Sequence, residues 1–193
     1  MAKKFLISQD INAFSLFRGA FTTTLCWNGS PLIATGYPLL NGGTETNLVT
    51  GTISNTSLQA AIVRLAQQKD QAGVVMGNTP KVLLVPTALF DTAVRVTNSV
   101  LTASSANNDV NVYLSVYGLA VFSSPYIDAI SGGSDKAWFL LSDNHTVTRY
   151  IRQGLNTALT DWTFSDNLSY RYQANFREGY AAISQVGIVA SQG

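Results

Sequence analysis

The sequence predicts an α+β protein, and three observations support this fold class. An apolar run at 82–85 lies between Pro80 and Pro86, as expected of a buried strand whose neighbours cannot donate to a ladder. Apolar residues recur at helical spacing on both sides of it, at 57–72 and after 87. Short β-favouring runs then fill the C-terminal third. The expected order is hairpin, helix, strand, helix and several strands, without regular alternation.

Composition limits the classes of function. A chain of 193 residues with 46% hydrophobic residues can bury a core. Charged residues make up only 12%, about half the share usual in globular domains. Twelve Lys and Arg nearly balance eleven Asp and Glu, so no strong overall field attracts DNA or membranes. Uncharged polar side chains dominate instead, which suits a surface that contacts protein neighbours, but also an extracellular β-rich protein.

The segment 22–50 is predicted to be a long two-stranded loop. Residues 19–63 contain a single charged side chain, Glu45, and the pair Asn28-Gly29 favours a tight turn. Pro31 and Pro38 argue against a position at the centre of a sheet. A two-stranded loop with so little core needs another surface to lie on. The alternative is an ordinary surface loop.

Two helices are expected around the buried strand. The first runs over 57–72, and its apolar stripe faces a sheet. Its start would be capped by Asn55, Thr56 or Ser57, and its end by Gly73. Thr87 would cap the second helix. The inner face of that helix would consist of Leu89, Phe90, Ala93 and Val94.

Further strands are expected toward the C-terminus. At 112–116, Val112, Leu114 and Val116 alternate with polar or aromatic residues, which is typical of a strand. A short apolar strand is predicted at 137–141, and β-rich segments at 146–153 and 169–190. A polar loop at 104–109 separates the second helix from these strands.

The sequence offers little for catalysis. The single Cys26 excludes an internal disulfide and a cysteine metal cluster. A thiol nucleophile formed by Cys26 and His145, the only histidine, is a weak alternative because no cation near Cys26 would lower its pKa. A hydrolase with paired aspartates is equally unsupported, since the acidic residues in loops have no metal-loop spacing. We expect no enzyme, no catalytic residue, no metal and no cofactor.

Five segments in this order resemble the tailed-phage major capsid proteins, especially the Mu-like major head subunits. They are WNGSPLIATGYPLLNGG, SLQAAIVRLAQQKDQAG, TPKVLLVPTALFDTAVRVTNS, GLAVFSSPYI and AWFLLSD. Asn28 stands where the family often has Asp, and Tyr37 where it often has His. The family's N-terminal arm has no counterpart in this sequence, which leaves a truncated chain, a short natural subunit or one piece of a split protein.

The resemblance implies the phage-capsid shell fold, which is Hong Kong 97-like and has an extended E-loop hairpin, a spine helix, and peripheral and axial domains. The implied domains are 1–21 as a remnant of the N-terminal peripheral segment, 22–50 as the E-loop hairpin, 51–78 as the spine helix and a peripheral segment, 79–145 as the axial domain, and 146–193 as the return into the peripheral sheet.

Site residues follow from the same resemblance. The E-loop would contact an adjacent subunit through Trp27, Leu32, Ile33, Tyr37, Leu39 and Leu40. The spine helix would pack through Leu58, Ile62 and Leu65. The core of the axial domain would contain Val82, Leu84, Leu89 and Phe90.

The implied function is that of a structural head protein which assembles into an icosahedral shell around phage DNA. Its partners would be copies of itself in hexamers and pentamers, neighbouring capsomers, packaged DNA in weak non-specific contact, and a scaffold, protease or decoration protein, with no membrane. The location would be the virion, after assembly in the bacterial cytoplasm. The alternatives are an encapsulin-like compartment and a β-rich virion binding or decoration module.

Overall fold

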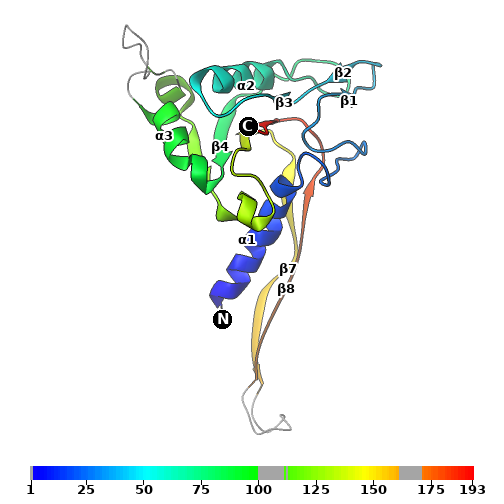
Figure 1. Ribbon diagram of the computed structural model, residues 1–193. Helices are drawn as coiled ribbons and strands as arrows, with labels where there is room; N and C mark the ends of the chain where they lie inside the picture. Colours follow the sequence, from blue (N-terminus) through cyan, green and yellow to red (C-terminus); the bar gives the residue numbers. More distant parts are fainter. Residues whose placement is uncertain (1, 100–110, 112, 161–170) are drawn as a thin grey trace. The chain divides into compact units, whose positions relative to one another are not determined.

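The predicted mixture of helices and strands is confirmed in the computed structural model, which describes residues 2–99, 111, 113–160 and 171–193 (Figure 1). Contacts divide the chain into two units. The first unit contains 1–146 and 182–193, and the second contains 147–181. Each unit is described by itself.

A five-stranded mixed sheet forms the centre of the first unit. Its strand order is β3-β9-β6-β4-β5. The bounds are β3 Leu48–Val49, β9 Ile188–Ser191, β6 Trp138–Ser142, β4 Pro80–Val85 and β5 Ala120–Ser123. β6 pairs antiparallel with both β4 and β9, whereas β3–β9 and β4–β5 are parallel pairs. Every residue of β6 and β9 is buried, as expected for strands in the middle of a covered sheet.

Two helices pack on this sheet. α2 (Asn55–Gln67) and α3 (Phe90–Asn98) are the elements that the apolar spacing at 57–72 and after 87 predicted. The stripe on α2 that contains Leu58, Ile62 and Leu65 lies in one hydrophobic cluster with Leu83, Leu140 and Val189 of the sheet. This cluster is the main core of the first unit.

A third helix, α1 (Ala2–Arg18), was not predicted. It begins with Ala2 and two lysines, has an unbroken apolar triplet at 5–7 and no acidic residue in its first turn, so neither a cap nor a clear stripe marks it. Phe14 stacks on Tyr126 with ring centroids 6.3 Å apart, and Phe17 meets Phe139 edge to face at 5.2 Å. Arg18 also donates to the carbonyl oxygen of Ser131 at 2.5 Å. Aromatic packing by its C-terminal half therefore holds α1 to the first unit.

The helix caps differ from those expected. Ser54, not Asn55, Thr56 or Ser57, caps α2, because its hydroxyl accepts from the backbone N–H of Ser57 at 3.2 Å and the Ser57 hydroxyl accepts from the N–H of Ser54 at 2.9 Å. α2 ends at Gln67, well before Gly73.

Thr87 is likewise not an N-cap but the first residue of a 3₁₀ turn, η1 (Thr87–Leu89), which leads into α3. Its N–H and its hydroxyl both donate to the buried carboxylate of Asp128, the N–H at 2.9 Å. A carboxylate distant in sequence thus replaces the local cap. Asp128 stands between two further 3₁₀ turns, η3 (Pro125–Ile127) and η4 (Ala129–Ser131).

The prediction of a strand at 112–116 is wrong. Residues Tyr113–Tyr117 form a π-helical turn, η2, and the extended segment begins only at Ala120 as β5. Tyr113 donates its hydroxyl to the carbonyl oxygen of Asn55 at 2.8 Å, which holds this turn beside the start of α2. Val112 and the loop expected at 104–109 lie outside the described residues.

The second unit consists of a two-stranded antiparallel sheet. β7 (Val147–Thr160) and β8 (Arg171–Ala182) are its strands, and both are long for a sheet of this size. The β-rich segments expected at 146–153 and 169–190 correspond to β7 on one side and to β8 and β9 on the other.

We expect Asp128→Ala to lower the free energy of unfolding by about 1–3 kcal/mol, because two donors of Thr87 lose a buried acceptor. Asp143→Ala is the matched control, since Asp143 is exposed and its effect should stay within about 0.5 kcal/mol. Urea denaturation followed by circular dichroism measures both. Equal stabilities of the two variants would contradict the role given to Asp128.

Candidate functional site

The structure places the six predicted contact residues of 22–50 in two groups. Leu32, Ile33, Tyr37 and Leu39 are buried within the chain itself. They are therefore unavailable to a neighbour, and the prediction of an arm without a core of its own is wrong for these four. Only Trp27 and Leu40 remain at the surface, with 58% and 77% of their area exposed.

Side-chain amides satisfy the backbone where parts of segment 22–50 enter the interior. The completely buried Asn47 accepts from the N–H of Ala34 at 2.9 Å and donates to the carbonyl oxygen of Leu32 at 2.8 Å. Within segment 22–50, β1 (Tyr37–Pro38) pairs with β2 (Thr44–Glu45), and β3 at the end of the segment pairs with β9. An irregular segment can enter an interior when each backbone polar group finds a partner.

A second pair of buried amides joins this segment to the C-terminal turn. Gln68 donates to the carbonyl oxygen of Gln185 at 2.9 Å and accepts from the N–H of Gly187 at 2.8 Å. Gln185 in turn donates to the side-chain oxygen of Asn28 at 3.1 Å. We call Asn28, Asn47, Gln68 and Gln185 the amide network. All its groups are uncharged, which keeps the desolvation cost below that of buried ions.

The exposed Leu40 lies beside a second loop. Its N–H donates to the carbonyl oxygen of Gln71 at 3.0 Å. The carboxylate of Asp70 fixes that loop by accepting from the N–H groups of Ala72 and Val74, both at 2.9 Å. Val74 is exposed, as are the adjacent Val75 and Met76. A rigid, exposed apolar tip of this kind is typical of a contact surface.

The residues predicted for the spine helix and for the core of the axial domain are mostly buried or half-buried. Leu58, Ile62 and Leu65 are buried, and Leu84 is buried in β4. Val82 and Leu89 are half-buried. Phe90 is 41% exposed, so its assignment to a core is wrong: α3 turns Ala93 and Thr97 inward instead.

The structure gives no support for a reactive thiol or a metal site. Burial raises the pKa of the Cys26 thiol to about 11, so the nucleophilic thiolate is absent at neutral pH. Burial likewise raises the pKa of Tyr37 to about 12. Within the described part of the chain, His, Cys, Asp and Glu form no group of three that could hold a metal ion. No helix among the same residues is long and apolar enough to cross a membrane.

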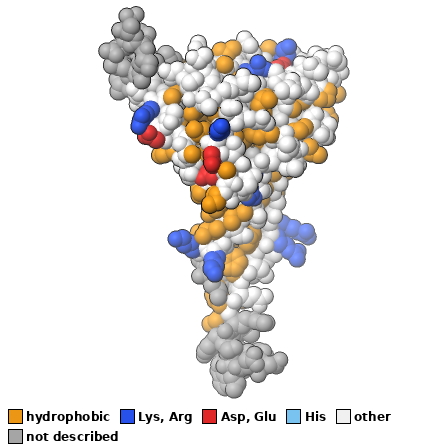
Figure 2. All heavy atoms as spheres, in the orientation of Figure 1, with side chains coloured by type: hydrophobic (Ala, Val, Ile, Leu, Met, Phe, Trp, Pro, Cys, Tyr) orange, Lys and Arg blue, Asp and Glu red, His pale blue; other side chains and the backbone are white. Residues whose placement is uncertain are grey.

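The second unit carries an exposed row of apolar side chains. Ile151, Leu155 and Leu159 are 60%, 44% and 65% exposed. Because side chains alternate along a strand, these odd-numbered residues lie on one face of β7. We call them the β7 apolar row. Figure 2 shows hydrophobic side chains at many places on the visible surface of the molecule.

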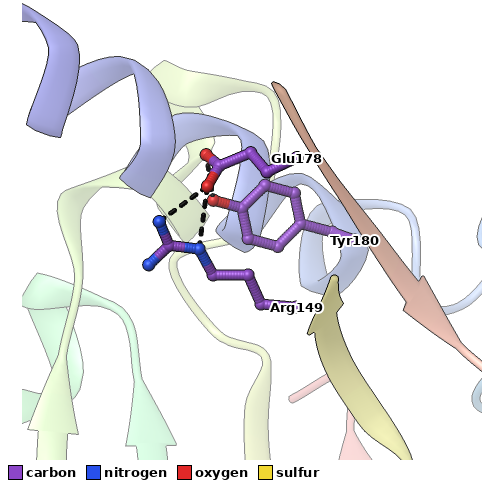
Figure 3. A network of polar contacts seen from close by, with 3 residues as sticks. All are labelled: Arg149, Glu178 and Tyr180. Atoms are coloured by element: carbon purple, nitrogen blue, oxygen red, sulfur yellow. Dashed lines mark hydrogen bonds and ion pairs between the residues drawn. The ribbon is translucent and has the colours of Figure 1, made fainter. Parts of the chain in front are cut away.

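An ion pair joins the two strands near the first residues of β7 (Figure 3). Arg149 contacts the carboxylate of Glu178 at 2.6 and 2.8 Å, and the hydroxyl of Tyr180 donates to the same carboxylate at 2.6 Å. The side chain of Glu178 is almost completely buried, so this pair is stronger than one at the surface. The contact also places the odd positions of β7 and the even positions of β8 on one face.

Sequence reasoning missed this surface, although a signal was present. The spacing 151, 155, 159 is a multiple of two and therefore marks one face of a strand. Polar residues at the intervening odd positions, Gln153 and Thr157, concealed it.

One comparison with known proteins shows the family of the chain. The sequence model of a family described as "Phage capsid protein" matches residues 10–190. No curated protein sequence matches the chain. Among solved structures, the chain is similar to the capsid of an empty GTA particle, with 13% identity and a TM-score of 0.47, over 98% of this chain and 65% of that one.

A second similar structure is the procapsid of satellite phage P4 including the size determination protein. The identity is 12% and the TM-score 0.38, over 83% of this chain and 46% of the other. The chain thus spans less than two thirds of the length of either structure that it matches.

Leu32 is buried and Leu40 is exposed, although both were predicted to contact an adjacent subunit. Their substitution should therefore affect stability differently. Leu32→Ala should lower the free energy of unfolding of the chain by about 2–5 kcal/mol, because it leaves a cavity. Leu40→Ala should change it by less than about 0.5 kcal/mol. Urea titration of both variants at high dilution, where copies do not associate, measures the difference. Equal small effects would restore the prediction of an arm without a core.

The raised pKa values generate a prediction about alkaline pH. The unfolded chain releases the Cys26 proton near pH 9.0 and the folded chain near 11, so the folded state binds more protons in this interval. Stability should therefore be constant up to about pH 9 and fall between pH 9 and 11. Cys26→Ala should make this fall shallower. Urea midpoints at pH 8, 9, 10 and 11 measure it, and identical slopes for both proteins would contradict the burial of the thiol.

Proposed function

Because this chain belongs to the phage capsid protein family, we propose that it is a structural subunit of a phage head, in which many copies assemble into the icosahedral shell. The observation that carries the proposal is the family match over residues 10–190. The family is one of capsid proteins, in agreement with a non-enzymatic role. As a component of the capsid, the protein would be part of the virion.

The second unit supplies the main contact between copies. A two-stranded sheet of this length is marginal by itself and gains stability when its apolar face is covered. The β7 apolar row is the exposed surface that such a contact would bury. The contact role that the sequence assigned to 22–50 therefore passes to β7 and β8 in this proposal. The apolar tip at Leu40 and Val74, together with Trp27, is a second contact surface in the first unit.

The axial domain and the spine helix are also part of this proposal. The sheet strands and α3 between 79 and 145 form the lobe that gathers around a capsomer axis, and α2 serves as the spine helix. Copies would associate as hexamers and pentamers. A scaffold, a protease and decoration proteins are further partners that the family resemblance implies.

Weak contacts suffice for such a shell. Burial of apolar area contributes about 25 cal/mol per Å², so a row of three side chains supplies a few kcal/mol at each contact. Many contacts made simultaneously by each copy then hold the shell together. The low share of charged residues, 12%, reduces the polar desolvation that opposes these contacts.

Electron microscopy and sedimentation velocity of the purified chain test the proposed function. Shells, rings or capsomers are the expected result. A monodisperse monomer at every concentration, with the second unit resistant to proteases, would contradict it and favour a binding or decoration module.

Charged residues in the β7 apolar row should prevent assembly. We expect Ile151→Asp/Leu155→Asp to raise the concentration needed for assembly by at least roughly tenfold, because two carboxylates would have to be desolvated at the contact. Asn156→Asp/Ala158→Asp is the matched control: it adds the same charge to the opposite face of the same strand. Sedimentation velocity measures both thresholds. Equal thresholds would show that the row is not the contact.

A further inference from the structure

The sequence contains two Asn-Gly pairs, Asn28-Gly29 and Asn41-Gly42, and both lie in turns of the first unit. The second pair belongs to the turn between β1 and β2 (Figure 1). An asparagine before glycine readily loses its side-chain amide, because glycine carries no side chain to shield its backbone nitrogen. The local sequence does not distinguish the two pairs, but their surroundings do.

The amide network holds both polar atoms of the Asn28 side chain. Its oxygen accepts from the backbone N–H of Ser30 and from the side chain of Gln185, both at 3.1 Å. Its nitrogen donates to the side-chain oxygen of Gln185 at 3.5 Å. Gln185 is itself completely buried. An attack on the carbonyl carbon of this amide must therefore first break bonds to a buried partner, which raises the barrier.

Asn41 is exposed and lacks such a clamp. Its amide oxygen accepts from the backbone N–H of Gly43 at 3.0 Å. Its amide nitrogen has no hydrogen bond among the described residues and lies against Gly73, where a Cβ atom would otherwise be. Attack by the nitrogen of Gly42 would place negative charge on the amide oxygen, and the N–H of Gly43 is already directed at this oxygen. The turn thus stabilises the developing charge and leaves the departing nitrogen unbound.

One hydrogen bond opposes the attack, but it is common to both pairs. The N–H of Gly42 donates to the carbonyl oxygen of Leu39 at 3.1 Å, and the N–H of Gly29 donates to that of Cys26 at 3.0 Å. Each nitrogen must leave its acceptor before it can react. The two pairs therefore differ in the environment of the asparagine and not in that of the glycine.

We infer that Asn41 is a site of spontaneous deamidation and that the amide network protects Asn28 from the same reaction. The nitrogen of Gly42 bonds to the side-chain carbonyl carbon of Asn41, the bond from this carbon to the amide nitrogen breaks, and ammonia leaves with the proton that Gly42 gives up. The product is a five-membered succinimide ring. One water molecule then opens the ring at either of its carbonyl carbons, which gives aspartate or isoaspartate. Either product carries a new carboxylate, which is ionised at neutral pH.

The new charge stands next to the exposed apolar tip. Leu40 precedes the site, and its N–H bonds to the loop that carries the carboxylate of Asp70 and the exposed Val74. A second carboxylate here must be desolvated when the tip is covered, and isoaspartate also lengthens the backbone of the turn. This consequence rests on the proposed function: a copy that stays unassembled for long would lose this contact surface, so recently folded copies would assemble preferentially.

Mass spectrometry of the full, unassembled chain tests the site. The chain is kept at mildly alkaline pH in native buffer and, in parallel, in guanidinium chloride. Trypsin then releases one peptide, 19–64, that contains both Asn-Gly pairs, because residues 19–63 contain no Lys or Arg. Fragment ions report the change from amide to carboxylate at Asn28 and at Asn41 in the same peptide, so Asn28 is an internal control.

In the folded chain, Asn41 should react at least roughly tenfold faster than Asn28, because only Asn28 must first release Gln185. In guanidinium chloride the two should react at similar rates. Equal rates in the folded chain would show that the amide network gives no protection. An unchanged Asn41 in the folded chain, at a time when it has reacted in guanidinium chloride, would remove the site. Either result overturns the inference.

Three variants test the consequence for assembly. Asn41→Asp installs the carboxylate, whereas Asn41→Ser keeps a short acceptor for the N–H of Gly43 and cannot deamidate. Gln59→Glu adds the same charge at an exposed position of α2. Sedimentation velocity should show that Asn41→Asp needs a roughly tenfold higher concentration for assembly than the other two.

Equal thresholds for Asn41→Asp and Asn41→Ser would contradict the effect on the apolar tip. A threshold raised equally by Gln59→Glu would mean that only net charge matters, which also contradicts it. Deamidation is measured on the unassembled chain. A chain that forms no shells therefore contradicts the proposed function and leaves the assignment of Asn41 intact.

Discussion

The first unit depends on the satisfaction of buried polar groups by the amide network. The end of α2, the segment before β3 and the turn at 185–187 converge in one interior, where buried side-chain amides bond to their backbone groups. Amides suit this position because each supplies both donors and acceptors without charge. Gln68 therefore serves a carbonyl oxygen and an N–H group at once. Without these bonds, each buried backbone group would oppose folding.

This constraint also defines where the chain leaves the first unit. The hydroxyl of Thr146 donates to the carbonyl oxygen of Ser184 and accepts from its N–H, both at 2.9 Å. Both crossings into 147–181 thus begin next to one hydrogen-bonded pair, and Gln185 anchors the segment that follows. The two chain segments that lead into the second unit are thus held together within the first unit.

Much of the fold could be predicted from local patterns, because periodicity reports which residues face a sheet. The apolar runs of β4 and β6 and the stripe on α2 were predicted for this reason. The failures concern interactions distant in sequence. A low charge content describes a segment buried in its own chain as well as one buried on a neighbour, so 22–50 was misassigned. Thr87 was predicted to cap a helix, because its contact with the distant Asp128 is not visible in the local sequence. The family was recognised from segment order, whereas the two faces of β7 required a cross-strand contact, Arg149 with Glu178, to define them.

The central position of β9 has a consequence for biosynthesis. β9 pairs with β3 on one side and with β6 on the other, so it separates two parts of the sheet that precede it by many residues. Such pairings close long loops and are slow to form. The nascent chain on the ribosome therefore cannot complete its sheet until the ribbon of β7 and β8 has been translated. Every copy with a complete sheet therefore also contains the translated segment 147–181.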